Sequence, residues 1–545
     1  MIKPSVDLSY SRVARWFAWG LPVLLLAASP SKANQYVQPN IVIILASDLG
    51  FSDLGCYGSE ILTPALDRLA QKGLRFTQFY NGGRSCPTRA SLLTGLYPHQ
   101  TGVGHMMIDY QRPGYRANLN NECATIAQIL RAAGYQTMMC GKWHLTKFVD
   151  SGGPKYNWPL QRGFDRFYGT IHGAGSYFDP VTLTQQNEFI RAAGDDYFYT
   201  DALSDHAVEY VEQAAKSDRP FFLYVACAAP HWPLHAPAEM ISRYRGKYAL
   251  GWDALAKQRH GKMISLGIVD ARWQPAPRDP RVGAWEQNAY KPWQQRRMEV
   301  YAAQIDLMDQ GIGRILERIR QTGAERNTLV MFLSDNGASD EEVSPQWQGI
   351  HIPSKTLRGR AVQSGNNPNI LPGPEDTYQS YGVAWANVGN TPFRLYSHYV
   401  HEGGIATPMI VHWPAVVLQT GKLTRQVGHV VDIMPTCLEA AKVPYPTHFG
   451  GYTLTPPAGE SLMPILQGQT RRRGPIFWEH EGNRAVRDGK WKLVSRYPGD
   501  WELYDMEADR TESNDLAARF PVIVQDLARA YETWAAKSNV EQWRK

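Results

Sequence analysis

The chain has 545 residues, of which 43% are hydrophobic and 20% are charged. These fractions are close to globular averages and exclude a disordered, collagen-like or coiled-coil chain. The 57 lysines and arginines exceed the 51 aspartates and glutamates by only six charges. No basic run is long enough to favour a nucleic-acid partner. The composition therefore indicates a large globular protein that does not bind nucleic acid.

The first 33 residues have the pattern of an export signal. Basic residues precede a mostly apolar stretch over residues 16–28, and Ser31-Lys32-Ala33 is a small-x-small cleavage site. The apolar stretch is short for a bilayer span, and no later stretch is long enough to cross a membrane. We expect residues 1–33 to be a signal peptide and the mature chain to be exported, periplasmic or secreted, without a membrane span.

Apolar strands and amphipathic helices alternate from residue 40 to about residue 411. The first strand, residues 40–46, is a continuous β-branched run, which is typical of a strand buried on both faces of a parallel sheet. The elements expected after it are a helix over 63–73, a strand over 74–78, a short helix before Gly95, a helix over 125–133, a strand over 135–140, a helix over 201–215, a strand over 221–226, a helix over 297–321, and strands over 328–333 and around 410–411. This alternation predicts an α/β fold with a large, mostly parallel sheet flanked by helices.

The rest of the chain has a different pattern. Residues 338–390 are rich in Gly, Pro, Asn and Gln without a clear period, which indicates a long irregular insertion. Short alternating runs between residues 476 and 504 predict an antiparallel meander, and residues 520–538 a terminal helix. We expect a catalytic-type domain over 34–465 and a smaller α+β domain, with an antiparallel sheet and a helix, over 466–545.

Polar residues follow four of the expected strands. These residues are Asp48, His144, His231 and the pair Asp335-Asn336. Each has an ordinary structural explanation by itself, because an aspartate often caps a helix and a histidine can fill a core. Ligands of parallel sheets bind beyond the carboxyl ends of the strands, so the five residues together predict a site at that edge.

The most informative segment is Ser85-Cys86-Pro87-Thr88-Arg89, which ends in Leu93-Thr94-Gly95. It resembles the Cys/Ser-x-Pro-x-Arg signature of the type I, formylglycine-dependent sulfatases of the alkaline phosphatase superfamily. Further segments that resemble family motifs occur in family order, and they are Asp48-Leu49-Gly50, Gly141-Lys142-Trp143-His144, Ala229-Pro230-His231-Trp232-Pro233 and Ser334-Asp335-Asn336-Gly337. The resemblance covers nearly all of the chain after residue 33. It implies an arylsulfatase-like hydrolase of sulfate esters, with a sulfated small molecule or glycan as substrate.

The resemblance also implies two cofactors. In this family the first residue of the signature, here Ser85, is converted to formylglycine by a maturing enzyme. One calcium ion is held by Asp48, Asp335, Asn336 and the side chain of residue 85. Carboxylate and amide oxygens suit such a hard cation. A hydrated aldehyde carries two hydroxyls, one to attack sulfur and one to expel sulfate, whereas serine has one.

The remaining motif residues match groups that handle the sulfate. Arg89 matches the arginine that supports the nucleophile. Lys142 and His231 match sulfate contacts, and His231 also matches a proton donor to the leaving oxygen. His144 matches a sulfate contact and the base of the second step. Such groups act where charge develops during hydrolysis.

Three positions carry serine where the family usually has another residue. Ser47 replaces an aspartate, which leaves a neutral oxygen at the calcium site and lowers its charge. Ser85 replaces the more common cysteine, although a minority of bacterial members use serine. Ser397 replaces a sulfate-binding lysine. We expect the sulfatase fold with strongly impaired hydrolysis.

Three other functions stay open. The first is an active serine-type arylsulfatase with Ser85 matured to formylglycine. The second is a non-catalytic binder of sulfated ligands, and the third is a related phosphatase or phosphonate esterase. Four further residues either line the substrate pocket or fill the core, and they are His105, His172, Trp232 and His235.

Overall fold

The structure is a computed structural model that describes residues 38–194 and 196–543. The expected signal peptide over 1–33 lies outside these residues. From Gln38 onward the chain forms one compact unit. None of the helices that the structure describes is both long enough and apolar enough to span a membrane.

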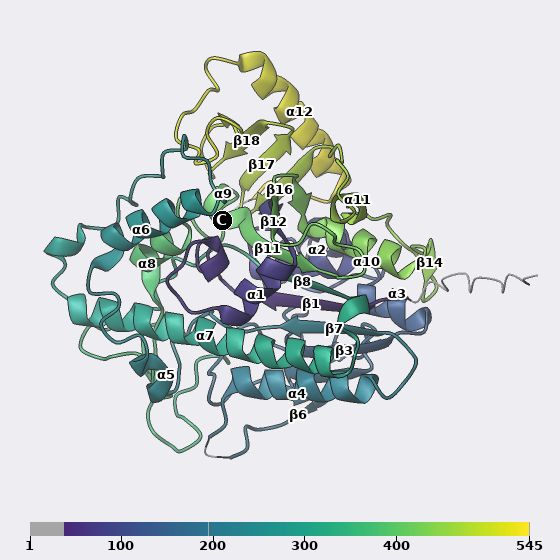
Figure 1. The fold of residues 1–545 in the computed structure, drawn as a ribbon, viewed down its shortest axis with the longest axis horizontal. Helices are drawn as coiled ribbons and strands as arrows, with labels where there is room; N and C mark the ends of the chain where they lie inside the picture. The colour runs from purple at the N-terminus through teal and green to yellow at the C-terminus, as the bar shows by residue number, and fades with distance from the viewer. Residues whose placement is uncertain (1–37, 195, 544–545) are drawn as a thin grey trace, which may run out of the picture. The chain divides into compact units, whose positions relative to one another are not determined.

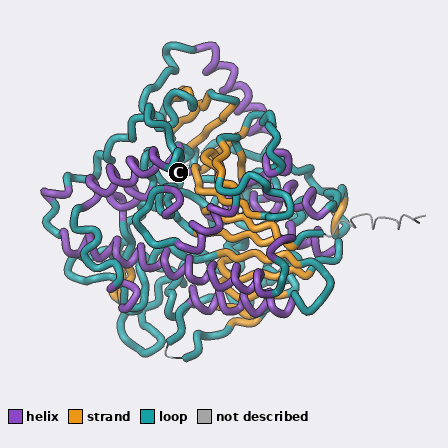
Figure 2. The backbone as a smooth tube through the Cα atoms, viewed as in Figure 1, coloured by secondary structure: helices purple, strands orange, loops and turns teal. Residues whose placement is uncertain are grey.

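The centre of this unit is an 11-stranded sheet (Figures 1 and 2). In spatial order its strands are β12 (Lys422–Thr424), β2 (Leu74–Tyr80), β11 (Ala406–His412), β8 (Thr328–Ser334), β1 (Asn40–Ala46), β7 (Phe221–Ala226), β3 (Gln136–Lys142), β4 (Arg166–Thr170), β5 (Leu183–Gln185) and β6 (Glu188–Phe189), with β13 (Gly428–His429) paired to β2. β1 runs parallel to both β7 and β8. β11 is antiparallel to β8 and β2, and β5 is antiparallel to β4 and β6. The prediction of a large, mostly parallel sheet is confirmed.

Helices cover both faces of this sheet (Figures 1 and 2). The α-helices are α1 (Pro64–Lys72), α2 (Ser85–Thr94), α3 (Ile126–Ala132), α4 (Tyr199–Ala214), α5 (Ala238–Ser242), α6 (Gly251–Ser265), α7 (Lys291–Gln321), α8 (Gly382–Gly389), α9 (Glu402–Ile405), α10 (Ile433–Ala441), α11 (Met463–Leu466) and α12 (Pro521–Lys537). α1, α4 and α7 contribute to the core on one face, and α2, α3 and α10 to the core on the other.

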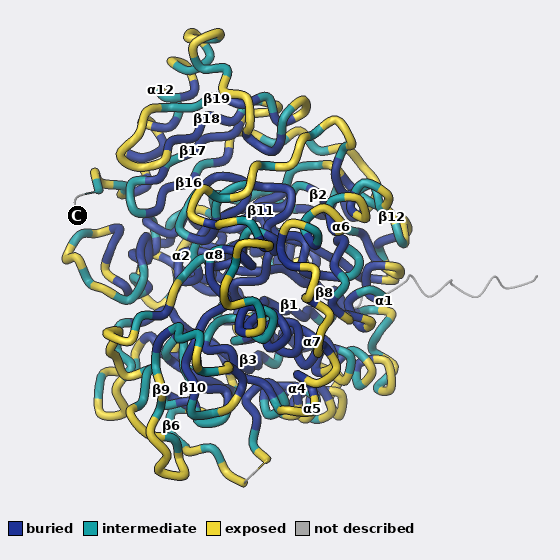
Figure 3. Tube along the Cα trace, turned by 90° about the vertical axis from the view of Figure 1, so that its left-hand side faces the viewer, coloured by how far each residue is buried: buried dark blue, intermediate teal, exposed yellow. Residues whose placement is uncertain are grey.

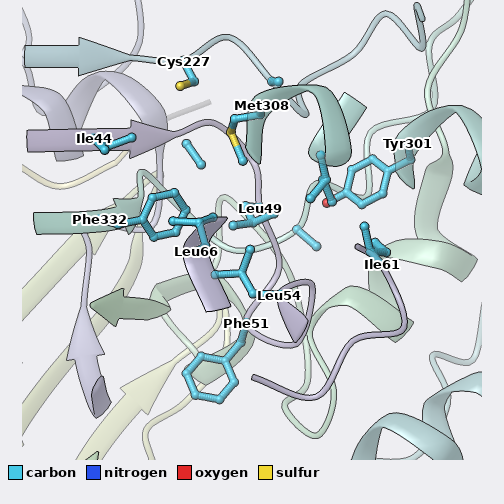
Figure 4. Close-up of a cluster of buried hydrophobic side chains, with 14 of the residues drawn as sticks. Ile44, Leu49, Phe51, Leu54, Ile61, Leu66, Cys227, Tyr301, Met308 and Phe332 are labelled. Carbon is cyan, nitrogen blue, oxygen red and sulfur yellow. The ribbon is translucent and has the colours of Figure 1, made fainter. Parts of the chain in front are cut away.

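The continuous apolar run of β1 has a direct structural reason. Val42 and Ile44 point into the first core, whereas Ile41 and Ile43 point into the second, and all four are fully buried. A strand with both faces covered has no position for a polar side chain. Figure 4 shows Ile44 in the first core with Leu66 of α1 and Met308 of α7.

The insertion over 338–390 contains more regular structure than the sequence predicted. It holds the short parallel pair β9 (Gln363–Ser364) and β10 (Thr377–Tyr378), and then α8. Trp385 of α8 is fully buried, with ring centroids 5.7 Å from Trp252 and 6.0 Å from Trp285. The helix therefore depends on aromatic partners that are remote in sequence. A further hairpin, β14 (His448–Phe449) and β15 (Tyr452–Thr453), follows α10.

The expected C-terminal meander and helix are present. The four antiparallel strands are β16 (Ile476–His480), β17 (Asn483–Asp488), β18 (Trp491–Ser495) and β19 (Glu502–Asp505). α12 packs on this sheet, where the ring of Trp534 stacks on that of Phe477 at 5.1 Å. In Figure 3 the strands of both sheets are largely buried, while exposed residues lie mainly in the loops. The domain boundary between residues 465 and 466 stays a prediction.

Candidate functional site

The site lies at the carboxyl edge of the large sheet. β1 leads into Ser47 and Asp48, and β8 leads into Asp335 and Asn336. β3 ends with Lys142. Because β1, β7, β8 and β3 are parallel and adjacent, their carboxyl ends meet at one edge (Figure 1).

The hydroxyl of Ser85, the first residue of α2, is the meeting point of three side chains. Its Oγ donates a hydrogen bond to Asp335 Oδ2 at 2.8 Å and accepts one from Arg89 Nε at 3.2 Å. His144 Nδ1 lies 3.3 Å from the same oxygen. These partners come from the end of β8, the next turn of α2 and the segment after β3, so residues far apart in sequence converge on one atom.

A fully buried ion pair supports this hydroxyl. Arg89 Nη2 lies 2.7 Å from Asp335 Oδ2, and its Nη1 donates to the carbonyl oxygen of Lys142 at 3.0 Å. Burial raises the pKa of Asp335, but the charges of Arg89 and Lys142 and the Ser85 hydrogen bond outweigh it and hold the pKa below its usual value. Asp335 is therefore ionised at neutral pH.

Lys142 occupies the space beside Ser47. Its Nζ donates to Ser47 Oγ at 2.9 Å, and Ser47 Oγ donates to Asp335 Oδ2 at 3.2 Å. Burial, followed by the charge of Arg89, lowers the pKa of Lys142 to about 8. An aspartate at position 47 would meet this ammonium with a carboxylate, whereas the serine meets it with a neutral hydroxyl.

Two buried side-chain oxygens, one from Asp48 and one from Asn336, lie in the same place. Asn336 Nδ2 donates to Asp48 Oδ1 at 2.6 Å, and the amide of Asp48 donates to Asp335 Oδ1 at 3.1 Å. Asp48 Oδ2 and Asn336 Oδ1 lack a hydrogen-bond partner among the described residues. Because buried oxygens are almost always paired, this donor set fits a hard cation.

Two histidines adjoin different groups of the site, since His144 lies near Ser85 Oγ and His231 near Asp48. His231 Nε2 is 3.6 Å from Asp48 Oδ2, and its Nδ1 is 2.5 Å from the carbonyl oxygen of Trp232. Burial lowers the pKa of both His144 and His231, so both rings are mostly neutral at pH 7. Asp48 and His144 also have left-handed backbones, with φ of 62° and 57°, a strain found mainly where function requires it.

Ser397 contacts a cation that the sequence did not point out. Arg84 Nη1 donates to Ser397 Oγ at 3.4 Å, and Arg84 Nη2 pairs with Glu341 Oε1 at 2.7 Å. Within the described residues, hydrogen bonds join Ser397 to Arg84 but not to the Ser85 hydroxyl. In the sequence, the position of Arg84 directly before the signature was the signal that could have identified this cation.

The side chain of Cys86 packs into the second core beside the site. It is 1% exposed there, and burial raises the pKa of its thiol to about 12. The hydroxyl of Ser85, not this thiol, therefore faces Asp335 and Arg89.

The four pocket candidates separate into different roles. The ring of His172 lies 5.9 Å from that of His144, and Trp232 donates a hydrogen bond to Glu341, so both adjoin the site. His235 is fully buried, with Nε2 2.6 Å from the carbonyl oxygen of Thr377, and is a core residue. His105 contacts the C-terminal meander instead, through Glu481.

Comparisons with known proteins match this architecture. The sulfatase family model matches residues 39–443, and the model for the C-terminal part of N-sulphoglucosamine sulphohydrolase matches residues 393–530. An uncharacterized sulfatase of Schizosaccharomyces pombe is 33% identical over 94% of this chain and 96% of its own length. An arylsulfatase of Klebsiella aerogenes is 33% identical over 84% of this chain and 98% of its own length.

A solved structure extends the likeness to the whole fold. The crystal structure of Ps i-CgsB in complex with k-i-k-neocarrahexaose covers 93% of this chain and 95% of its own, with a TM-score of 0.66 and 23% identity. Since the family model spans most of the chain, and the site residues follow the strand ends in family order, the chain belongs to the sulfatase family.

Proposed function

We propose that this chain binds sulfate esters at Ser85 and hydrolyses them slowly, because three groups that support the reaction in its family are serine here. The observation that carries the proposal is the convergence of Arg89, His144 and Asp335 on Ser85 Oγ. A cradle of this kind positions a nucleophile and stabilises the charge that develops around it.

The cations at the site suit an anionic ester. Lys142 Nζ and the guanidinium of Arg84 supply positive charge for the sulfate oxygens. His144, 3.3 Å from Ser85 Oγ, is placed to accept a proton from the group at that position. His231 would donate a proton to the leaving oxygen, and its lowered pKa limits the protonated form to acidic pH.

Asp48, Asp335 and Asn336 would hold one calcium ion together with the side chain of residue 85. The unpaired oxygens of Asp48 and Asn336 support this assignment. When bound, the ion would supply positive charge that polarises a sulfate oxygen. Ser47 offers only a neutral oxygen, and calcium affinity falls when a charged ligand is lost, so binding should be weak.

Maturation of residue 85 decides whether turnover continues. Attack of the Ser85 hydroxyl on sulfur would release the alcohol and leave a sulfated serine, which has no second hydroxyl to expel sulfate. Formylglycine, made by a maturing enzyme, supplies that second hydroxyl when hydrated. The second candidate function is therefore an active serine-type arylsulfatase, and the intact set of Arg89, Lys142, His144 and His231 favours it.

The substrate is a sulfated small molecule or a sulfated glycan. The oligosaccharide bound to Ps i-CgsB supports a glycan. We also propose that the mature chain is exported, to the periplasm or outside the cell.

The proposal is tested on protein purified from its native host. We expect binding of an aryl sulfate by calorimetry, slow release of no more than one chromophore per chain, and a Ser85 peptide of unmodified mass before the substrate is added. A peptide lighter by two hydrogens, with sustained turnover, would establish the serine-type enzyme instead. Faster release from an aryl phosphate would indicate a phosphatase, and absence of sulfate-ester binding would contradict the proposal.

A further inference from the structure

A second group of metal-ligating side chains lies away from Ser85, at the start of the C-terminal meander. His480 is the last residue of β16, and Glu481 begins the turn to β17. His105 reaches them from a loop after α2. One ligand atom from each of these three residues lies within 4.8 Å of the others. We call these residues the His480 cluster.

The contacts within the cluster bring nitrogen and oxygen atoms together. His105 Nε2 lies 2.9 Å from Glu481 Oε1. The rings of His105 and His480 stack with centroids 5.3 Å apart and planes 13° apart. The second carboxylate oxygen of Glu481 lies 3.3 Å from His398 Nδ1, which offers a fourth ligand nearby.

The imidazole of His480 is buried and has no hydrogen bond to the described part of the chain. It is 0% exposed, and neither ring nitrogen has a hydrogen-bond partner among the described residues. Its Nε2 is 3.9 Å from Glu481 Oε1, which is too long for a hydrogen bond. The equally buried His235 contrasts with it, because both of its ring nitrogens are within hydrogen-bond distance of a backbone group.

An unpaired buried imidazole is costly, and a bound ion would remove that cost. Two imidazoles and one carboxylate form a known zinc donor set, and nitrogen ligands disfavour calcium and magnesium. We therefore propose that the His480 cluster binds a divalent transition-metal ion of the zinc class.

Aromatic residues cover the cluster on one side. The ring of Trp543 stacks on His105 at 5.1 Å, and Tyr110 meets the same ring edge-on at 5.2 Å. His398, on the other side, follows Ser397 in sequence. The ion would thus add positive charge near the position where the family lysine is absent, but its binding does not require a sulfate ester.

The experiment uses the full mature chain without added histidines, stripped of metal with a chelator and titrated with Zn²⁺ against a chromophoric indicator. We expect one zinc ion per chain in saturating Ca²⁺, and visible d–d absorption when Co²⁺ replaces zinc. His480→Gln and Glu481→Gln should each weaken zinc binding by about tenfold or more. His206→Gln is the matched control, because its Nδ1 also lies near a glutamate, Glu209, at 3.5 Å.

Each result has a definite meaning. Stoichiometric binding that is lost in the two variants and kept in the control supports the site. Zinc displaced by calcium would lie at Asp48, and zinc that binds both variants normally would lie elsewhere, so either result overturns the proposal. The side chain of Glu481 is 32% exposed, so Glu481→Gln should fold and decides the question if His480→Gln does not.

Discussion

Lys142 Nζ donates a hydrogen bond to Ser47 Oγ at 2.9 Å, inside a site where both residues are fully buried. The ammonium therefore contacts a neutral oxygen at a position where the resemblance to the sulfatase motif implies a carboxylate. Burial and the charge of Arg89 lower the pKa of Lys142, and the neutral Ser47 hydroxyl adds no negative charge to offset them.

Ser47→Asp should strengthen calcium binding. The new carboxylate would add a charged ligand, and we expect the dissociation constant for Ca²⁺ to fall by roughly tenfold or more, about 1.4 kcal/mol. Calorimetric titration measures it. Ser47→Asn is the control of equal size without the charge, and an equal gain in both variants would contradict the explanation.

Lys142 should make stability increase with pH in the alkaline range. Its pKa falls from 10.5 in the unfolded chain to about 8 in the fold. Between these values the unfolded chain holds more protons, so the free energy of unfolding rises with pH, by about 3 kcal/mol in total. Below about pH 8 Lys142 is protonated in both the folded and the unfolded chain, so the full free-energy cost of burying its charge is present.

The measurement is urea unfolding at several pH values from about pH 7 to about pH 10. Lys142→Met should remove the alkaline increase, whereas Lys147→Met, at a partly exposed lysine paired with Asp109, should keep it. The same slope in all three proteins would show that another group is responsible.

Arg89→Met should destabilise the fold by about 3–5 kcal/mol, because it leaves the carboxylate of Asp335 buried without its cation. The double variant Arg89→Met with Asp335→Asn should recover part of this loss. Denaturant unfolding gives both values. Arg320→Met serves as the control, because Arg320 pairs with Glu317 at the exposed surface. It should not change the free energy of unfolding measurably. A double variant less stable than Arg89→Met would exclude charge burial as the cause.

The combined variant Ser47→Asp, Ser85→Cys, Ser397→Lys should recover turnover of an aryl sulfate in a host that converts the cysteine to formylglycine. It restores the carboxylate, the more common nucleophile precursor and the sulfate-binding cation together. Release of the chromophore measures it, and the variant that keeps Ser85 shows how much the precursor contributes. If the combined variant stays inactive although residue 85 is converted, the defect lies outside these three positions.

The sequence predicted the central strands of the large sheet well because these strands have a simple, continuous apolar pattern. β1 and β7 have the expected bounds, since a strand covered on both faces is apolar at every position. The polar residues that follow these strands meet at one edge because parallel strands end there. Local pattern therefore located Asp48, His144 and Asp335, whereas Lys142 was predicted only from the family resemblance.

Other features depend on distant partners that no local pattern contains. α8 is stabilised by the packing of Trp385 against Trp252, which is more than 130 residues away in sequence. The contact of His105 with Glu481 joins residues 376 positions apart. Arg84 was adjacent to the motif, but only the fold brings Ser397 to it.

The burial of α2 limits when residue 85 can be modified. Every residue of this helix is buried, and Ser85 is 3% exposed. An enzyme that oxidised this side chain would have to admit it into its own active site, so it would need a nascent or unfolded chain. The proposed conversion of residue 85 to an aldehyde would therefore have to precede folding.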